Sequence, residues 1–245
     1  MSFKCVFCGG DRGISFSVRE KEYYRCSECE GVFMAPKSRL SPEKQKERYL
    51  KHNNTLENSG YVDFLRSFIE PVLGFIKRQR CDDTERANMR ILDYGSGPEP
   101  VLVELLEAYR KEGVLYNDYG IRDFEIRGWD PFFAPETQFY EGGADLVTCL
   151  EVAEHFESPD EDFAKLSSCV KGGGFLAVGT MLLPQGGEEA FKSWWYRSDA
   201  THVSFYTENA LRTVAAKNGL SLVERLSDRI FVFKKDNGFQ VMRVS

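Results

Sequence analysis

The sequence has no long apolar run, and no stretch approaches the roughly 20 apolar residues of a membrane-spanning helix. Its first residues lack an apolar segment behind a basic start, which argues against a secretory signal peptide. We therefore expect a cytoplasmic protein with no membrane partner. The chain is 42% apolar and 13% aromatic, so wholesale disorder is excluded and a sizeable core is expected.

The sequence also lacks a strong excess of basic residues and any internal repeat. Its net charge of −6 argues against a general binder of phosphate backbones. Residues 1–90 hold 17 lysines and arginines against 13 acidic residues, whereas residues 91–245 hold 15 against 25. A weakly basic front leaves contact with an anionic partner open. A length of 245 residues fits one full domain with a small appendage.

Cysteine is present in an odd number, seven, without an export signal, so a disulfide scaffold is a poor interpretation. Four of the cysteines form two Cys-x-x-Cys pairs, which are Cys5 with Cys8 and Cys26 with Cys29. The intervening stretch falls within the spacing of four-cysteine zinc sites, so we predict a closed, structural zinc site. The alternative is a set of unrelated buried or redox thiols. We expect ordinary thiols at the remaining three positions, Cys81, Cys149 and Cys169.

Changes in composition and residue pattern along the chain predict three units. They are a zinc ribbon in residues 1–36, a helical linker or lid in residues 37–89, and an α/β domain in residues 90–245. Two short strands are expected in the ribbon, at 15–18 and 22–25. Ser41 and Pro42 indicate a helix start, with Ser41 as the N-cap. Apolar residues at spacings of three and four predict a longer helix from Tyr61 to Arg80.

From Arg90 onward, apolar strands alternate with helical segments. The expected strands are 91–94, 124–129, 145–150, 175–179, 221–227 and 230–234, and the expected helices are 101–109, 160–169 and 207–218. Thr207 is the predicted N-cap of the last helix. This alternation predicts a mostly parallel, doubly wound sheet, and the final hairpin adds an antiparallel C-terminal edge strand.

A glycine loop, Asp93-Tyr94-Gly95-Ser96-Gly97, follows the first of these strands and precedes a helix. Glycine allows the backbone to turn sharply and to approach a bound cofactor. Asp130 ends the next strand, where a carboxylate can accept hydrogen bonds from ribose hydroxyls. The structural alternatives are an Asp93 that caps backbone amides and an Asp130 that only forms a turn before Pro131.

Several segments together carry a family resemblance. They are Ile91–Gly97, Gly128–Pro131, Ala144–Leu150, Glu151–Phe156 and Val170–Phe175. In this order, residues 90–245 resemble a class I S-adenosylmethionine-dependent methyltransferase with a Rossmann-like sheet. The Glu-Val-x-Glu-His pattern is similar to a segment common in small-molecule methyltransferases. A zinc ribbon before such a domain is also similar to the architecture of some sugar C-methyltransferases.

The resemblance implies a set of cofactor-binding residues. Asp93, Tyr94, Gly95, Ser96 and Gly97 would line the methionine end of S-adenosylmethionine. Asp130, followed by Pro131, would hold the ribose, and Leu150 with Glu151 would border the cofactor and the substrate.

The loop departs from the family pattern at Glu99, which stands where a third glycine is often found. A carboxylate there either crowds the cofactor or begins the helix, where its negative charge interacts favourably with the helix dipole. A catalytically degenerate binding module therefore stays open as an alternative. A nicotinamide dehydrogenase is disfavoured because Pro100 occupies its third glycine position.

Only three histidines are available as a general base. His202 lies in an aromatic-rich stretch after the fifth strand of the family pattern and is the first candidate. His155 follows the fourth strand and is the second, while His52 is expected at the surface or in a lid. Residues near His202 are candidate substrate contacts, namely Trp195, Tyr196, Arg197 and Tyr206. The alternative is a packing loop with a satisfied histidine.

Two absent motifs narrow the chemistry. No Asn-Pro-Pro-Tyr-like segment follows the fourth strand, which disfavours methylation of amino nitrogens on bases and glutamine. No Pro-Cys pair is present, which disfavours a cysteine-nucleophile cytosine methyltransferase. The favoured function is methyl transfer to a small metabolite or biosynthetic intermediate. The alternative is an RNA or protein methyltransferase that docks its substrate through the zinc ribbon.

Overall fold

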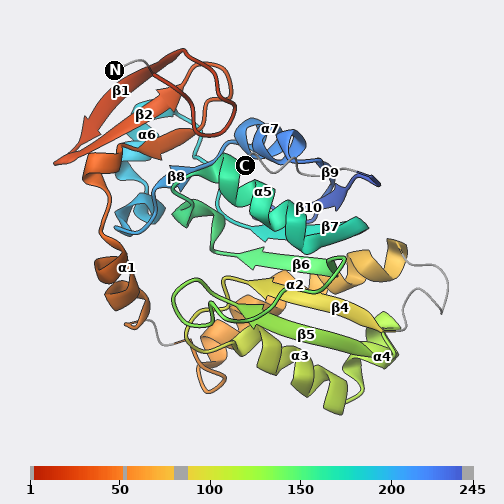
Figure 1. Cartoon of the computed structure of the whole chain (residues 1–245). Coiled ribbons are helices and arrows are strands. Elements are labelled where there is room, and N and C mark those ends of the chain that lie inside the picture. Colours follow the sequence, from red (N-terminus) through yellow and green to blue (C-terminus); the bar gives the residue numbers. More distant parts are fainter. Residues whose placement is uncertain (1–2, 52–53, 80–87, 239–245) are drawn as a thin grey trace.

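The computed structural model describes residues 3–51, 54–79 and 88–238 of the chain. A six-stranded main sheet dominates it (Figure 1). Its strands are β4 (Met89–Tyr94), β5 (Phe124–Trp129), β6 (Ala144–Leu150), β7 (Val170–Gly179), β9 (Leu220–Arg225) and β10 (Ile230–Lys235). The spatial order is β5-β4-β6-β7-β10-β9.

The main sheet is parallel from β5 to β7, and β10 and β9 then pair antiparallel. The prediction of a mostly parallel sheet with an antiparallel C-terminal edge strand is therefore confirmed. In the register of β4, Tyr94 lies beside Trp129 of β5, and Asp93 lies beside Thr148 of β6. The glycine loop, Asp130 and Glu151 thus all follow strand ends at one edge of the sheet.

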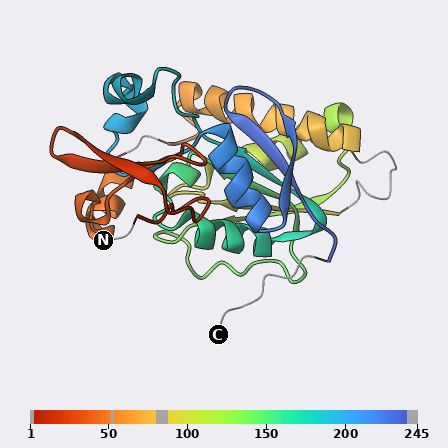
Figure 2. The same cartoon turned by 90° about the horizontal axis from the view of Figure 1, so that it is seen from above.

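Helices cover both faces of this sheet (Figure 2). One face packs against α2 (Ser59–Gln79), α3 (Val101–Lys111) and α4 (Val114–Tyr119), and the other against α5 (Pro159–Cys169) and α7 (Glu208–Lys217). The predicted three–four spacing of α2 is confirmed, because its apolar side chains are buried against the sheet. The helix continues through Pro71.

The second sheet has the order β1-β2-β3-β8 and contains β1 (Gly13–Val18), β2 (Lys21–Cys26), β3 (Val32–Met34) and β8 (Ser204–Phe205). The sequence predicted β1 and β2 but neither β3 nor β8. Val32 pairs with Phe205, and the backbone amide of Met34 donates to the carbonyl of Val203 at 2.7 Å. A strand of two residues is too short to show an alternation of apolar and polar side chains. Only the tertiary fold therefore reveals that β8, from the C-terminal half of the chain, completes the small sheet.

The other helices are α1 (Pro42–Tyr49), α6 (Gly187–Ser193) and three 3-10 turns, η1 (Pro36–Ser38), η2 (Ala153–His155) and η3 (Trp195–Ser198). Ser41 occupies the N-cap position of α1 as predicted, although its side chain makes no capping hydrogen bond. Thr207 is the N-cap of α7 as predicted, and its hydroxyl accepts from the amide of Ala210. The sequence did not predict α4 or α6, since six or seven residues carry little periodicity.

Three sequence-based expectations concern residues whose structure is not described here, namely the surface or lid position of His52, the helix end at Arg80 and the ordinary thiol Cys81. None of the helices within the described parts of the chain has the length and apolar character that crossing a membrane requires.

Aromatic packing joins the N-terminal ribbon to the main domain. Phe7 is fully buried, with its ring centroid 5.0 Å from that of Tyr206 and 6.0 Å from that of Phe33. These rings belong to the same apolar cluster as the side chains of α5 and α7. The ribbon therefore shares its core with the α/β domain.

Replacing Phe7 with alanine tests this shared core. We expect Phe7→Ala to lower the free energy of unfolding by about 3–5 kcal/mol, because it removes a fully buried ring between two parts of the chain. Ile14→Ala in the same ribbon is the control, since Ile14 is 57% exposed and should cost less than about 0.5 kcal/mol. Urea unfolding of zinc-saturated protein measures both, and equal small losses would contradict the shared core.

Candidate functional site

The glycine loop after β4 needs two residues in the left-handed region. Gly95 has φ +86° and Gly97 has φ +72°. A Cβ at Gly95 would lie 2.3 Å from Cγ2 of Val152, which follows β6. The amides of Gly95 and Ser96 both donate to the carbonyl of Trp129, at 2.7 and 3.1 Å. Glycine at position 95 therefore lets the loop fit between the ends of β5 and β6.

Asp130 holds the two neighbouring loops together. Its Oδ2 accepts from the amide of Gly97 at 3.1 Å, and its Oδ1 accepts from the amides of Phe132 and Phe133 at 2.8 and 3.1 Å. The turn role that the sequence offered as an alternative is thus present. The carboxylate also lines the main cavity, where its remaining lone pairs can accept hydrogen bonds from a ligand.

Asp93 lies inside the protein at the end of β4. It is 6% exposed, and its Oδ1 accepts from the hydroxyl of Thr148 at 2.8 Å. Burial raises the pKa of Asp93 to about 6, while the hydrogen bond from Thr148 opposes that shift. No backbone amide is among the hydrogen bonds described for Asp93, so the amide-capping alternative is not what the structure has.

A cavity of about 640 Å³ opens at this edge of the sheet. Both candidate histidines line it, and so do eight of the nine predicted cofactor residues, namely Tyr94, Gly95, Ser96, Gly97, Asp130, Pro131, Leu150 and Glu151. Asp93 is not among the lining residues. A Cβ on Gly97 would meet no atom within 4 Å, so the space in front of this turn is open. Glu99 is exposed at the cavity and does not fill it.

The predicted substrate contacts near His202 do not line the cavity. They are Trp195, Tyr196, Arg197 and Tyr206. Trp195 is 65% exposed, and the buried guanidinium of Arg197 donates to backbone carbonyls of α6. The buried hydroxyl of Tyr206 donates to the carbonyl of Ala153. Tyr196, Arg197 and Tyr206 are buried and pack the loop instead, and backbone carbonyls accept the hydrogen bonds of Arg197 and Tyr206 that a substrate would need.

The sequence missed part of the cavity lining, an aromatic wall of Tyr49, Tyr61 and Phe64 with two polar side chains beside it. It comes from α1, α2 and the chain between them, through Gln45, Tyr49, Asn54, Tyr61 and Phe64. Burial raises the pKa of Tyr61 to about 12, so its phenol stays protonated at neutral pH. No motif marks these positions, because they belong to helices that reach the site only through tertiary packing.

Lys165 of α5 is a second residue that the sequence did not reveal. Its Nζ lies 3.8 Å from the centroid of the Trp129 ring, and both side chains line the cavity. An ammonium over an indole face is a favourable cation–π contact. The pair therefore forms a flat, positively charged wall beside Asp130.

The two histidines share one orientation. Nδ1 of His155 lies 3.0 Å from the carbonyl of Thr201, and Nδ1 of His202 lies 2.8 Å from the carbonyl of Tyr196. A carbonyl oxygen only accepts, so each Nδ1 carries a proton and the lone pair of the neutral ring is on Nε2. Burial lowers the pKa of both rings, and that of His202 falls to about 3 because a protonated His155 beside it would also repel a second positive charge. Both rings are therefore neutral at pH 7.

Two carboxylates lie next to the histidines. Burial raises the pKa of Glu151 to about 8, and the charge of Glu154 adds to this. Burial also raises the pKa of Glu154, to about 7, although hydrogen bonds with the hydroxyls of Tyr196 and Thr180 oppose this shift. Glu151 has φ +51°, an uncommon conformation for a residue that is not glycine. Such strained backbone and perturbed acids cluster at functional sites.

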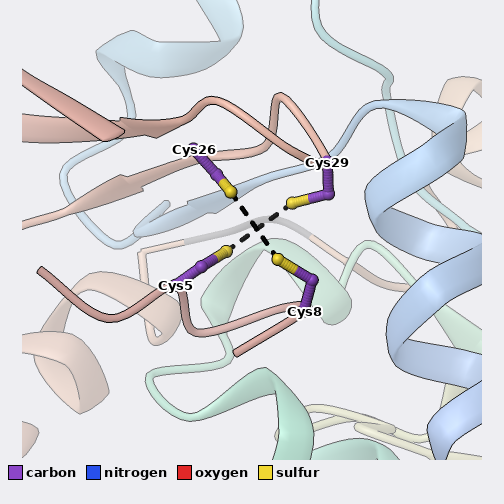
Figure 3. Close-up of side chains that lie close together, drawn as sticks. All are labelled: Cys5, Cys8, Cys26 and Cys29. Atoms are coloured by element: carbon purple, nitrogen blue, oxygen red, sulfur yellow. Dashed lines mark hydrogen bonds between the residues drawn. The ribbon is translucent and has the colours of Figure 1, made fainter. Parts of the chain in front are cut away.

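The four N-terminal cysteines converge on one point (Figure 3). The sulfurs of Cys5 and Cys29 lie 3.6 Å apart, and so do those of Cys8 and Cys26. All four sulfurs lie within 4.8 Å of one another, and none forms a disulfide. The predicted clustering of the two Cys-x-x-Cys pairs is confirmed.

The spacing of the sulfurs suits a tetrahedral ion. Zn–S bonds of about 2.3 Å at tetrahedral angles separate the sulfurs by about 3.8 Å. The amide of Gly10 donates to Sγ of Cys8, and the amide of Glu28 donates to Sγ of Cys26, both at 3.3 Å. Such bonds stabilise thiolates, so the donor set fits a structural zinc ion.

A family model described as a methyltransferase domain matches residues 66–225, which is about two thirds of the chain. The match includes most of α2, the parallel strands and the strand ends that line the cavity. No curated protein matches the chain.

Solved structures resemble the chain at low identity. An O-methyltransferase family protein from Burkholderia thailandensis is 18% identical with a TM-score of 0.46, over 80% of this chain and 64% of that one. The magnesium protoporphyrin IX methyltransferase of Synechocystis PCC 6803, solved with bound SAH, is 16% identical with a TM-score of 0.40, over 80% and 95%. The YcgJ protein of Bacillus subtilis is 16% identical with a TM-score of 0.41, over 62% and 68%.

Asp93→Asn tests whether the buried carboxylate costs stability. The pKa of Asp93 rises from 3.8 to about 6 on folding, so the folded state binds this proton more tightly. Wild-type stability is therefore lost as pH rises through this window, by up to about 3 kcal/mol at 1.36 kcal/mol per pKa unit. Asparagine avoids this loss and still accepts from Thr148, so the ligand-free variant should be the more stable protein above pH 6.

Urea unfolding between pH 4.5 and 8 measures this difference. The gap between Asp93→Asn and wild type should grow as pH rises to about 6 and then level off. Asp228→Asn is the control, because the side chain of Asp228 is 99% exposed and should show no such gap. A variant that is less stable than wild type at pH 8 would contradict the assignment of burial as the dominant cause.

Proposed function

The chain belongs to this methyltransferase family, and from that premise we propose that it transfers a methyl group from S-adenosylmethionine to a small molecule held in the main cavity. Dependence on S-adenosylmethionine comes with the family. The observation that carries the proposal is one cavity of about 640 Å³ that is lined both by the glycine loop and by aromatic residues and histidines. Such a volume is typical of sites for small ligands.

The cofactor side of this cavity is assigned to the ends of β4 and β5. Gly95, Ser96 and Gly97 would face the methionine end, and Asp130 would accept hydrogen bonds from the ribose. Trp129 and Lys165 offer a flat wall beside Asp130. The open space in front of Gly97 and the exposed position of Glu99 support this assignment, because they leave room for the cofactor beside the glycine loop. Bound there, S-adenosylmethionine supplies an electrophilic methyl group on a sulfonium.

The acceptor side is assigned to the region where Glu151 and the two histidines meet the aromatic wall. The acceptor would lie among Tyr49, Tyr61 and Phe64, which exclude water, with its reactive group against the histidines. Nε2 of His202 or His155 carries a free lone pair and would accept the proton of the acceptor. Positioning of the acceptor next to the methyl group supplies much of the rate in such a reaction.

The N-terminal helices are proposed to close over this site. Arg48 of α1 forms an ion pair with Asp199 at 2.8 Å, and Lys46 donates to the carbonyl of Phe132 at 3.1 Å. Oδ1 of Asp199 accepts from the amide and the hydroxyl of Thr201, next to His202. The segment that covers the cavity is thus tied to the loop that carries the candidate base. The predicted unit from 37 to 89 would act as a lid in this way.

A covered cavity favours a small acceptor over RNA or protein. A macromolecule would have to present its reactive group past α1, which lines the cavity through Gln45 and Tyr49 and is held by contacts to residues 132 and 199. The weakly basic front of the chain is the remaining argument for a macromolecular substrate, and it rests on a small charge excess. We therefore keep the small metabolite or biosynthetic intermediate as the proposed acceptor class.

Zinc is the proposed occupant of the four-cysteine cluster, and its role is structural. The carbonyl of Cys29 accepts from the hydroxyl of Thr207 at 2.6 Å, and the same hydroxyl accepts from the amide of Ala210 to cap α7. Folding of the cysteine loop is thereby connected to the helix that follows β8. The predicted ribbon unit from 1 to 36 would then support the α/β domain and take no part in the chemistry.

Asp130→Asn tests the cofactor assignment. We expect the affinity for S-adenosylhomocysteine to fall about 10- to 100-fold, because the variant loses the charge that accepts from the ribose and from Gly97. Asp145→Asn is the matched control, since Asp145 is equally buried at 7% exposure but stands at the opposite end of β6. Calorimetric titration of both variants decides the matter. Equal affinities in the two variants would contradict a role for Asp130 in binding.

Metal content tests the zinc assignment. Purified wild-type protein should contain about one zinc ion per chain, and Cys26→Ser should lose it and melt at a lower temperature, because metal binding is coupled to folding. Cys149→Ser, at a fully buried cysteine in β6, should keep the zinc. Mass spectrometry of the metals reports the content. Wild-type protein that folds and melts normally without zinc would refute the assignment.

A further inference from the structure

Among the described residues, Glu154 is a buried acid whose neighbours Thr180 and Tyr196 leave one carboxylate oxygen without a hydrogen-bond partner. The residue has 0% exposure, and its Oε2 accepts from the hydroxyl of Thr180 at 2.9 Å. Its other oxygen, Oε1, has no hydrogen-bond partner within the described part of the chain. A buried carboxylate oxygen without a partner is costly, which indicates that something else occupies the space beside it.

The unpartnered oxygen points toward the histidine pair. Oε1 of Glu154 lies 4.0 Å from Nε2 of His202. One carboxylate oxygen of Glu154 and one ring nitrogen each from His155 and His202 all lie within 4.8 Å of one another. The two imidazole rings contact each other with centroids 4.8 Å apart. Three potential ligands thus converge at the floor of the cavity. Two come from η2, between β6 and α5, and the third comes from the loop before β8.

The second ring nitrogens complete the pattern of a metal site. Each Nδ1 is fixed by a backbone carbonyl, that of Thr201 for His155 and that of Tyr196 for His202. Metal-binding histidines almost always donate their other N–H to such a partner, which aims the lone pair of the ligating nitrogen. Packing of Tyr49 against His155, with centroids 5.4 Å apart, fixes that ring further.

We propose that Glu154, His155 and His202 bind a divalent transition-metal ion at the floor of the cavity. Two imidazoles and one carboxylate suit Mn²⁺, Fe²⁺, Co²⁺ or Zn²⁺. Ligand bonds of about 2.1 Å place adjacent ligands about 3.0–3.4 Å apart, so the side chains close by roughly 1 Å when the ion enters. His155 and His202 line the cavity, which leaves the remaining positions of the ion open to an acceptor.

The role of the ion rests on the proposed function, although its binding does not. A cation in this position holds an oxygen of the acceptor and lowers the pKa of that hydroxyl. The hydroxyl proton leaves to water, and the ion keeps its oxidation state. The acceptor class narrows accordingly to molecules that are methylated on, or beside, a metal-binding oxygen. With the ion bound, the histidines act as ligands, and without it they can act as bases.

Titration of the full chain with Mn²⁺ tests the site. One equivalent of zinc per chain is supplied first, so that the four thiolates take it and the site at Glu154, His155 and His202 stays free. Mn²⁺ favours oxygen and nitrogen ligands over thiolates. We expect one Mn²⁺ ion per chain by calorimetry and by the electron paramagnetic resonance signal of free Mn²⁺. Glu154→Gln and His202→Ala should each weaken binding more than about 100-fold, beyond the 10- to 100-fold effect of an outer-shell residue. Glu136→Gln, at an exposed carboxylate, should bind Mn²⁺ like wild type.

A parallel titration with S-adenosylhomocysteine separates the two proposals and shows that the variants are folded. A protein that binds S-adenosylhomocysteine but no Mn²⁺ would overturn the metal site and leave the methyltransferase assignment intact. Mn²⁺ binding that survives both Glu154→Gln and His202→Ala would overturn it as well. Mn²⁺ binding without S-adenosylhomocysteine binding would instead support the metal site and contradict the proposed function.

Discussion

The parallel pairing of β4 with β5 on one side and β6 on the other is the constraint on which the site depends. Parallel strands present their carboxyl ends at the same edge, so Gly95, Asp130 and Glu151 meet there although they are far apart in sequence. Gly95 permits this meeting, because any side chain at that position would collide with Val152. Asp130 then fixes the glycine loop to the turn after β5.

The site is completed by parts of the chain that lie outside the sheet. Helices α1 and α2 supply the aromatic wall, and the loop before β8 supplies His202. The same loop leads into β8, which pairs with β3 of the N-terminal ribbon. The ribbon, the candidate base and the cavity therefore belong to one continuous set of contacts, and a change in the ribbon should be felt at the site through β8.

The sequence predicted the parts of this arrangement that local chemistry determines. Spacing alone identified the four cysteines, and a glycine turn between a strand and a helix identified the cavity edge. It could not identify Tyr61 or Lys165, because a side chain on a helix face carries no mark of the cavity it lines. It placed Arg197 and Tyr206 with the substrate because the stretch is aromatic, whereas their polar groups are used by nearby carbonyls. The convergence of Glu154 with His202 also depends on tertiary packing, since 47 intervening residues separate them.

Hydrogen–deuterium exchange with and without saturating S-adenosylhomocysteine tests the central claim, that the cofactor binds where β4, β5 and β6 end. The amides of residues 94–97, 130, 132, 133 and 150–152 should exchange more slowly with the ligand present, because these residues line the cavity or hold its loops. Protection confined to the opposite edge of the sheet, around Arg90 and Lys171, would contradict the account. Binding without protection at Gly97 and Asp130 would contradict it equally.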